Sequence, residues 1–483
     1  MADPAFRSAA DLAGALQRRE LSSRELLEHF LERVERLNGR INAVVTLDAE
    51  RARERADAAD AALARGESWG ALHGLPVTVK DCFETAGLRT TAGAPEYARH
   101  VPREDAIAVR RLVEAGAVVF GKTNTPALAA DWQTYNALHG TTRNPWDPER
   151  SPGGSSGGAA AAIAAGLSGL ELGSDIGGSI RLPSHCCGVF GHKPTWGIVP
   201  LRGFIPGPPG TLSEDDINVA GPIARAAEDL ELALGVLAGP AGDRARGWRL
   251  ELPPPRRTAL RDYRVAVWLD DPDCAVDDAV RDRLAAVAEA LRKAGARVDP
   301  AARPALRLGE ALRLYRRLLA PIVASSFGAD RLAALAQWAA ESAERAEVAE
   351  FVSSATASHL DWCAAHEERE HQRATWAEFF RDYDVLLCPV SILPAIPHDH
   401  SEPLMLRRLE VNGQVRPYTD QLGWVGPIGA ALLPATVAPA GRTPGGLPVG
   451  VQIVAGHLED RTSIDFARRL ADEIGGFESP PGW

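Results

Sequence analysis

The chain has 483 residues, of which 45% are hydrophobic and 24% are charged, and this balance is typical of a globular protein. Its formal net charge is −11 and it has no clustered run of Lys and Arg, which argues against a nucleic-acid partner. The sequence shows neither an apolar stretch of about 18 residues nor the basic start of a signal peptide. We therefore expect a cytoplasmic protein that binds no membrane.

Helical and strand-like patterns follow one another along the chain. Helices are predicted at 9–38, with a capping box formed by Ser22 and Glu25, and at 49–65. The next predicted elements are a strand at 75–81, a helix at 105–117, a strand at 118–122, a helix at 158–166 and a strand at 169–175. Strand, helix and strand in succession are typical of a parallel crossover.

The second half of the chain is richer in helix. A Gly/Pro-rich loop is predicted at 200–222, a helix at 223–239 and a Pro-containing linker at 240–262. Further predicted elements are a strand at 263–269, a helix at 275–295, a helical region at 304–380, strands at 383–390 and 447–455, and a helix at 459–475. The whole pattern predicts an α/β protein with a mixed sheet sandwiched by helices.

Lysine is rare in this chain. Only Lys80, Lys122, Lys193 and Lys293 occur among the 53 basic residues, so the other 49 are arginine. Arginine keeps its proton in proteins, whereas lysine can lose it, so a retained lysine suits a role that arginine cannot fill. Lys80 lies in the strand-like segment LPVTVKD, where apolar neighbours favour a neutral amine.

Two Gly-Gly-Ser segments flank a predicted helix and strand. The first covers 153–158 and contains Ser155; the second covers 175–179 and ends on Ser179. Glycines let backbone N–H groups turn towards an anion, and a helix N-terminus adds a favourable dipole. Such an arrangement can stabilise an oxyanion, although each segment alone also fits an ordinary glycine turn.

Other chemistries fit the sequence less well. Gly153-x-Ser155-x-Gly157 matches a nucleophile elbow, but the three prolines in the preceding TTRNPWDPERSP are incompatible with the strand that an elbow needs. No phosphate-loop or dinucleotide motif occurs, and His366 and His371 are spaced i, i+5, which misses a zinc-binding helix face. The six cysteines suggest buried thiols, with Cys82 as an alternative nucleophile. We expect neither metal nor cofactor.

Five segments carry a specific resemblance. GLPVTVKD (74–81), GKTNTPALA (121–129), GTTRNPWDPERSPGGSSGGAAAAIAAG (140–166), GSDIGGSIRLPSHCCGVFGHKPT (173–195) and GLPVGVQIV (446–454) resemble, in order, the signature segments of the amidase signature family. The resemblance implies that family's twisted mixed sheet in a single domain over 1–483, with a signature core at about 70–225 plus 383–475. It also implies a helical, substrate-shaping region at about 270–380.

The same resemblance implies roles for individual residues. Lys80 would be the base, Ser155 a bridging serine that follows a cis peptide bond, and Ser179 the nucleophile. The remaining roles are an oxyanion hole formed by the N–H groups of Ile176, Gly177, Gly178 and Ser179, and bracing of the loop by Asp175 and Arg181. A small-molecule amide, carbamate (urethane) or ester would be cleaved through an acyl-enzyme without a cofactor.

Substrate and assembly are less constrained. His192 stands where many relatives have leucine, and the segments 196–199 and 217–222 differ from the tRNA-dependent amidotransferase subunits. These differences favour a free-standing amidase over a glutaminase-type subunit. Residues 200–215 and 305–380 are expected to shape the acyl pocket for an aryl or hydrophobic group. Its candidate lining residues are Trp132, Trp338, Trp362, Trp376, Phe204, Ile205, Pro206 and Leu212. A homodimer is compatible with the resemblance.

Overall fold

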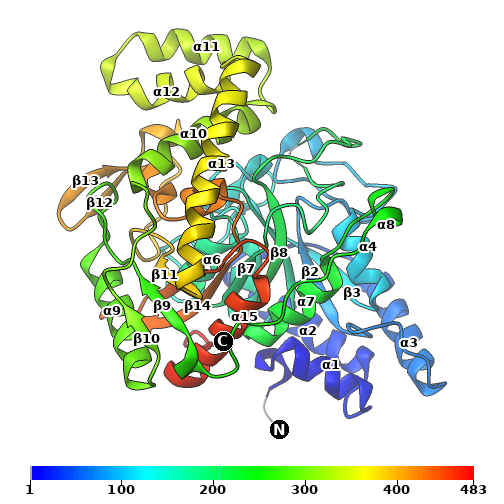
Figure 1. The fold of residues 1–483 in the computed structure, drawn as a ribbon. Helices are drawn as coiled ribbons and strands as arrows, with labels where there is room; N and C mark the ends of the chain where they lie inside the picture. Colours follow the sequence, from blue (N-terminus) through cyan, green and yellow to red (C-terminus); the bar gives the residue numbers. More distant parts are fainter. Residues whose placement is uncertain (1–2, 206) are drawn as a thin grey trace.

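A mixed sheet of 11 strands runs through the computed structural model, which describes residues 3–205 and 207–483 (Figure 1). The order of the strands is β1 (Val44–Leu47), β3 (Val118–Thr123), β2 (Pro76–Lys80), β6 (Glu171–Asp175), β8 (Val219–Ala224), β7 (Phe190–Lys193), β14 (Ala435–Arg442), β15 (Pro448–Val454), β11 (Val385–Pro389), β9 (Arg264–Val267) and β10 (Arg297–Asp299). The predicted fold class is thereby confirmed.

Strands β2 and β6 set the position of the catalytic lysine candidate. They are parallel neighbours, with Thr78 opposite Glu171 and Val79 opposite Leu172. Both strands are buried along their whole length, as parallel strands covered on both faces are. Their carboxyl ends therefore meet at one edge of the sheet, which brings Lys80 close to the loop that follows Asp175.

Helices lie around the sheet (Figure 1). The helices are α1 (Ala9–Gln17), α2 (Ser23–Leu37), α3 (Ala49–Ala64), α4 (Ile107–Glu114), α5 (Gly157–Ala164), α6 (Arg181–Cys187), α7 (Ala227–Leu237), α8 (Arg244–Gly247), α9 (Asp278–Lys293), α10 (Leu308–Ala324), α11 (Ala329–Ala340), α12 (Ala346–Ala355), α13 (His359–Asp382), α14 (Gly426–Ala430) and α15 (Asp460–Ile474). Helices α5 and α6 pack against each other, while α15 packs on α7 and α9. No helix within the described ranges is long and apolar enough to cross a membrane.

The predicted helical region consists of α10 to α13. In Figure 1, α11 and α12 lie farthest from the sheet, at the top of the view, and α13 runs from them down towards it. Helix α10 packs on α12, α13 and α14. Two small hairpins, β4–β5 (Tyr135–Asn136 with Gly140–Thr141) and β12–β13 (Arg408–Val411 with Gln414–Pro417), lie outside the large sheet.

The observed starts of some helices and the positions of several strands agree with those predicted from the sequence. The capping box of α2 is present, because Glu25 N–H donates to Ser22 Oγ (3.1 Å) and Ser22 N–H donates to Glu25 Oε2 (2.9 Å). The loop predicted at 200–222 is partly wrong, since β8 begins at Val219, and the helix predicted from 223 begins at Ala227. Of the strands in the large sheet, β1, β7, β8, β10 and β14 are absent from the prediction.

Candidate functional site

Lys80 lies at the end of β2 with its side chain fully buried. Its Nζ is 2.6 Å from Ser155 Oγ and 2.9 Å from Ser174 Oγ. Burial lowers the pKa of Lys80 to about 8, against the opposing influence of Cys82, Asp175 and Glu171. The amine therefore loses its proton at a lower pH than an exposed lysine does, which is a property that suits a general base. Ser174 is a contact that the sequence did not single out.

Two other lysines are also buried but contact different groups. Lys122 Nζ donates to the Phe83 carbonyl and to Thr85 Oγ1 (3.0 Å). Lys193 Nζ donates to the carbonyls of Pro194 (3.0 Å) and Leu433 (2.7 Å). Burial lowers the pKa of both as well, but neither amine faces a pair of serine hydroxyls. Of the three buried lysines, Lys80 is the one whose amine is hydrogen-bonded to Ser155.

The two serine segments meet beside Lys80. The Gly154–Ser155 peptide bond is cis, and Ser156 N–H donates to the Ser179 carbonyl (3.2 Å). This hydrogen bond holds the main chain next to Ser155 against Ser179. Only 5% of the Ser179 surface is exposed, and within the described residues its Oγ makes no hydrogen bond. The hydroxyl of Ser179 is thus left without a hydrogen-bonding partner in the described part of the chain, as a candidate nucleophile requires.

Helix α5 can approach this site because it begins with small residues. A Cβ on Gly158 would lie 2.4 Å from Asn124 N and 2.5 Å from Asn124 O, so only glycine fits against that backbone. All eight residues of α5 are buried. The close packing fixes the position of Ser155, two residues before the helix.

Asp175 and Arg181 organise the loop between β6 and α6. The fully buried Asp175 carboxylate accepts hydrogen bonds from Gly178 N–H (2.9 Å), Ile180 N–H (3.1 Å) and Arg181 Nη2 (2.8 Å). Burial alone would raise the pKa of Asp175, but the Arg181 guanidinium lowers it to about 2. The predicted bracing contacts therefore exist in the structure.

The oxyanion-hole candidates differ in their availability. Gly178 N–H is already directed at Asp175, so in this structure it is engaged within the loop. The N–H groups of Ile176, Gly177 and Ser179 have no acceptor within residues 3–205 and 207–483. These three groups are the donors that the loop leaves available to a developing negative charge.

The carbonyl groups of the same loop are held by two aromatic side chains. Tyr315 in α10 donates from its hydroxyl to the Ile176 carbonyl (2.6 Å), and Trp132 Nε1 donates to the Gly177 carbonyl (2.9 Å). Trp132 is predicted to line the acyl pocket, and its indole contacts the loop itself. The sequence carries no signal for Tyr315.

The other residues suggested for the acyl pocket lie in different environments. Trp376 is buried in the core, stacked with Phe380, and Trp338 in α11 packs under Arg345. Phe204 packs on Phe83 with ring centroids 5.1 Å apart. Ile205 is buried, Leu212 is largely exposed, and Pro206 lies outside the described residues.

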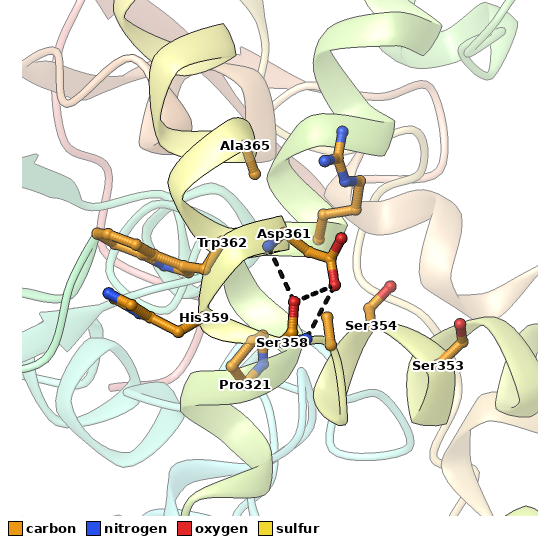
Figure 2. Close-up of a pocket in the computed structure, with 10 residues that line it drawn as sticks. Pro321, Ser353, Ser354, Ser358, His359, Asp361, Trp362 and Ala365 are labelled. Atoms are coloured by element: carbon orange, nitrogen blue, oxygen red, sulfur yellow. Dashed lines mark hydrogen bonds between the residues drawn. The ribbon is translucent and has the colours of Figure 1, made fainter.

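A cleft of about 770 Å³ lies between α10, α12 and α13 (Figure 2). Its lining residues are Arg317, Pro321, Ser353, Ser354, Ala357, Ser358, His359, Asp361, Trp362 and Ala365. Ser358 and Asp361 cap the start of α13 by hydrogen bonding to each other, so these polar groups already have partners. Lys80, Ser155 and Ser179 do not line this cleft, which is therefore distinct from the serine site.

The rival chemistries find no support in the geometry. No strand directly precedes Ser155, as a nucleophile elbow would require. Burial raises the pKa of the Cys82 thiol, which disfavours the reactive thiolate. His366 stacks on Trp362, whereas His371 is exposed. Within the described ranges, no group of three or more His, Cys, Asp and Glu side chains is arranged to hold a metal ion.

Known proteins resemble this chain over nearly its whole length. The profile of the Amidase family matches residues 25–464. The chain is 32% identical over 471 residues to the indoleacetamide hydrolase of Bradyrhizobium diazoefficiens, covering 97% of this chain and 86% of that one. It is 34% identical to a glutamyl-tRNA(Gln) amidotransferase subunit of Deinococcus radiodurans, covering 96% and 97%. A crystal structure of an amidase superposes with a TM-score of 0.78 at 31% identity, covering 97% and 100%.

Proposed function

This chain belongs to the amidase signature family of hydrolases, which act on C–N bonds, and we propose that it cleaves an aryl or hydrophobic carboxylic amide through an acyl-enzyme on Ser179. The observation that carries the proposal is the buried contact between Lys80 and Ser155, 2.6 Å long, beside the loop that presents Ser179. A depressed lysine pKa makes this pair a proton acceptor for a serine nucleophile.

The proposed reaction moves one proton along the three side chains. Neutral Lys80 takes a proton from Ser155, which takes the proton of Ser179 as its Oγ adds to the amide carbonyl carbon. The carbonyl oxygen becomes an oxyanion facing the free N–H groups of the loop. When the C–N bond breaks, the proton returns through Ser155 to the departing nitrogen. Water then adds to the ester by the same relay and releases the carboxylic acid.

An apolar acyl group fits the side chains around the loop. Ile176 is half-buried and packs against the buried cluster that contains Tyr315, Leu422 and Val425. Trp132 packs against the same cluster. A hydrophobic or aromatic acyl group bound there would remove further apolar surface from water, at about 25 cal/mol per Å². The name of the indoleacetamide hydrolase relative points to a substrate of the same character. Carbamates and esters are compatible with the same chemistry.

A glutaminase subunit of an amidotransferase is the second candidate. The observation in its favour is that amidotransferase subunits match this chain at an identity similar to that of the hydrolases. Such a subunit would release ammonia from glutamine and gain activity from a partner chain.

The proposed function is tested with a panel of p-nitroanilides and with glutamine, together with labelling by a fluorophosphonate. We expect release of nitroaniline from aryl and hydrophobic members, little ammonia from glutamine, and a covalent label on the peptide that contains Ser179. Labelling at another residue would contradict the assigned nucleophile. Hydrolysis of glutamine but of none of the p-nitroanilides would favour the subunit role.

The activity should depend on pH through Lys80. Because the amine must be neutral to act as the base, kcat/KM is expected to rise as the pH passes about 8 and to level off above it. Nitroanilide hydrolysis followed from about pH 6 to 10 measures this limb. The limb should persist in Lys122→Met, because Lys122 Nζ contacts Phe83 and Thr85 and not Ser155. A profile that is flat across this range in the wild type would exclude Lys80 as the base.

A further inference from the structure

The loop after β6 is held by hydrogen bonds at several points. Asp175 accepts from the N–H groups of Gly178 and Ile180, as described above. On the carbonyl side of the loop, Tyr315 donates to Ile176 and Trp132 donates to Gly177. These two donors come from segments that are remote in sequence, since Tyr315 and Ile176 are 139 residues apart.

The contact of Tyr315 concerns one particular peptide group. The carbonyl of Ile176 and the N–H of Gly177 belong to the same planar, trans peptide unit and therefore point in opposite directions. A donor that fixes the carbonyl also fixes the direction of the N–H. It polarises the unit as well, which strengthens the N–H as a donor to an anion.

Without such a contact, this peptide group would be poorly fixed. Gly177 and Gly178 follow it, and glycine tolerates conformations that other residues avoid. The close packing supports the role of the aromatic pair: a Cβ on Gly177 would lie 3.3 Å from Tyr315 Oη and 3.7 Å from Trp132 Nε1. Both donor groups therefore lie in close contact with the main chain at Gly177.

Tyr315 is itself rigidly placed as a donor. The side chain is fully buried, and its ring lies so close to α14 that a Cβ on Gly426 would be 2.7 Å from its Cδ1. Burial raises the pKa of the phenol well above its usual range, so the hydroxyl keeps its proton. The Ile176 carbonyl is the acceptor for that proton.

From this geometry we infer that Tyr315 is a positioning residue, whose hydroxyl orients and polarises the Ile176–Gly177 peptide group so that Gly177 N–H stabilises the oxyanion. The inference rests on the proposed function, because an oxyanion forms there only if Ser179 adds to a carbonyl carbon. Tyr315 itself touches neither the substrate nor the reacting atoms in this role.

The test compares Tyr315→Phe with the wild type. The variant keeps the ring and removes only the hydroxyl. We expect kcat for a p-nitroanilide to fall about tenfold, less than the loss from deleting an oxyanion donor outright, with KM changed by less than about twofold. The matched control is Tyr263→Phe, which removes another buried tyrosine hydroxyl, bonded to Asp465 Oδ2 at 2.9 Å, and should leave kcat unchanged.

A second measurement separates positioning from stability. Trifluoroacetophenone accepts the Ser179 oxygen at its carbonyl carbon. The Ser179 proton passes to Ser155, which gives its own proton to Lys80, so that a ketone-derived oxyanion is left in the loop. Its Kd, measured by ¹⁹F NMR, should rise about tenfold in Tyr315→Phe and stay unchanged in Tyr263→Phe. A variant that is merely less stable would show a lower Tm with unaltered ketone affinity.

The outcomes distinguish this inference from the proposed function. If Ser179→Ala still forms the ketone adduct, the nucleophile is misassigned, and the proposed function and this inference are both wrong. If Ser179→Ala loses the adduct while Tyr315→Phe retains the wild-type kcat and ketone affinity, only the positioning role is overturned. A loss in Tyr315→Phe that appears in KM alone would also overturn it, because ground-state binding does not involve the oxyanion.

Discussion

Substituting Ser179 with alanine should lower kcat for amide hydrolysis by roughly 10⁴-fold or more, the largest effect expected of any single change in this chain. The nucleophile disappears, and the N–H groups of the loop then have no tetrahedral oxyanion to stabilise. Lys80→Ala and Ser155→Ala should each cost several orders of magnitude, since the proton relay is broken. Initial rates with a p-nitroanilide measure all three variants.

The combined variant is the sharper comparison. If Lys80, Ser155 and Ser179 act as a unit, Lys80→Ala added to Ser179→Ala should cause no further loss. Ser184→Ala is the matched control, because Ser184 is also buried nearby but its Oγ donates to the Ile180 carbonyl (2.8 Å). Its kcat should stay close to that of the wild type. Retention of more than about a tenth of the activity by Ser179→Ala would disprove the assignment.

Arg181→Met should destabilise the protein strongly, by about 3–5 kcal/mol. The substitution leaves Asp175 as an unpaired carboxylate in the interior, where both side chains of the pair are fully buried. It also removes the donors to the Val425 carbonyl (2.9 Å) and to Gln452 Oε1 (2.7 Å). Urea unfolding followed by circular dichroism gives the loss of free energy.

Two further measurements assign that loss to the buried charge. Because the pKa of Asp175 is held below its ordinary value, at about 2, the ion pair contributes its full stability above pH 4 or so. That contribution should be lost as the pH falls towards 2 in the wild type. The double variant Asp175→Asn/Arg181→Met should be more stable than Arg181→Met, because no unpaired charge remains.

An exposed ion pair supplies the control for this experiment. Arg65 and Glu67 are in contact at the surface, with more than half of each side chain exposed. Solvent screens such pairs, so Arg65→Met should leave the urea midpoint unchanged. An equal shift for Arg65→Met and Arg181→Met would show that the loss does not come from the buried pair.

The sequence predicts several strands that are rich in apolar and β-branched residues, but it misses β1, whose four residues are all apolar or β-branched. Strands β2 and β3 lie where PVTVK and VVFGKT indicate. Strand β8 escapes prediction because VAGPIA contains Gly221 and Pro222, which usually mark loops. In the fold, Gly221 is needed within the strand, since a Cβ there would lie 2.2 Å from the His192 carbonyl of β7. A close approach between two strands leaves no periodic pattern in the sequence from which the strand could be predicted.

The residues of the candidate site likewise divide into those that the sequence predicts and those that it does not. Signature segments indicate the residues that surround Lys80, because the chemistry demands particular residue types at fixed positions. Tyr315 cannot be found in this way, because its role depends on how α10 packs against the loop and not on a local motif. His192, which the sequence marks only as a departure from relatives, forms a buried link between Thr436 Oγ1 (2.9 Å) and Asp460 Oδ1 (3.1 Å). Both partners lie more than 240 residues away.

The placement of lysine has a practical consequence for handling the protein. Lys80, Lys122 and Lys193 are fully enclosed, whereas three quarters of the Lys293 side chain is exposed at the end of α9. An N-hydroxysuccinimide ester therefore meets a single accessible lysine amine on the folded surface. Coupling through Lys293 would place a resin or a fluorophore at the end of α9, without acylating the amine beside Ser155.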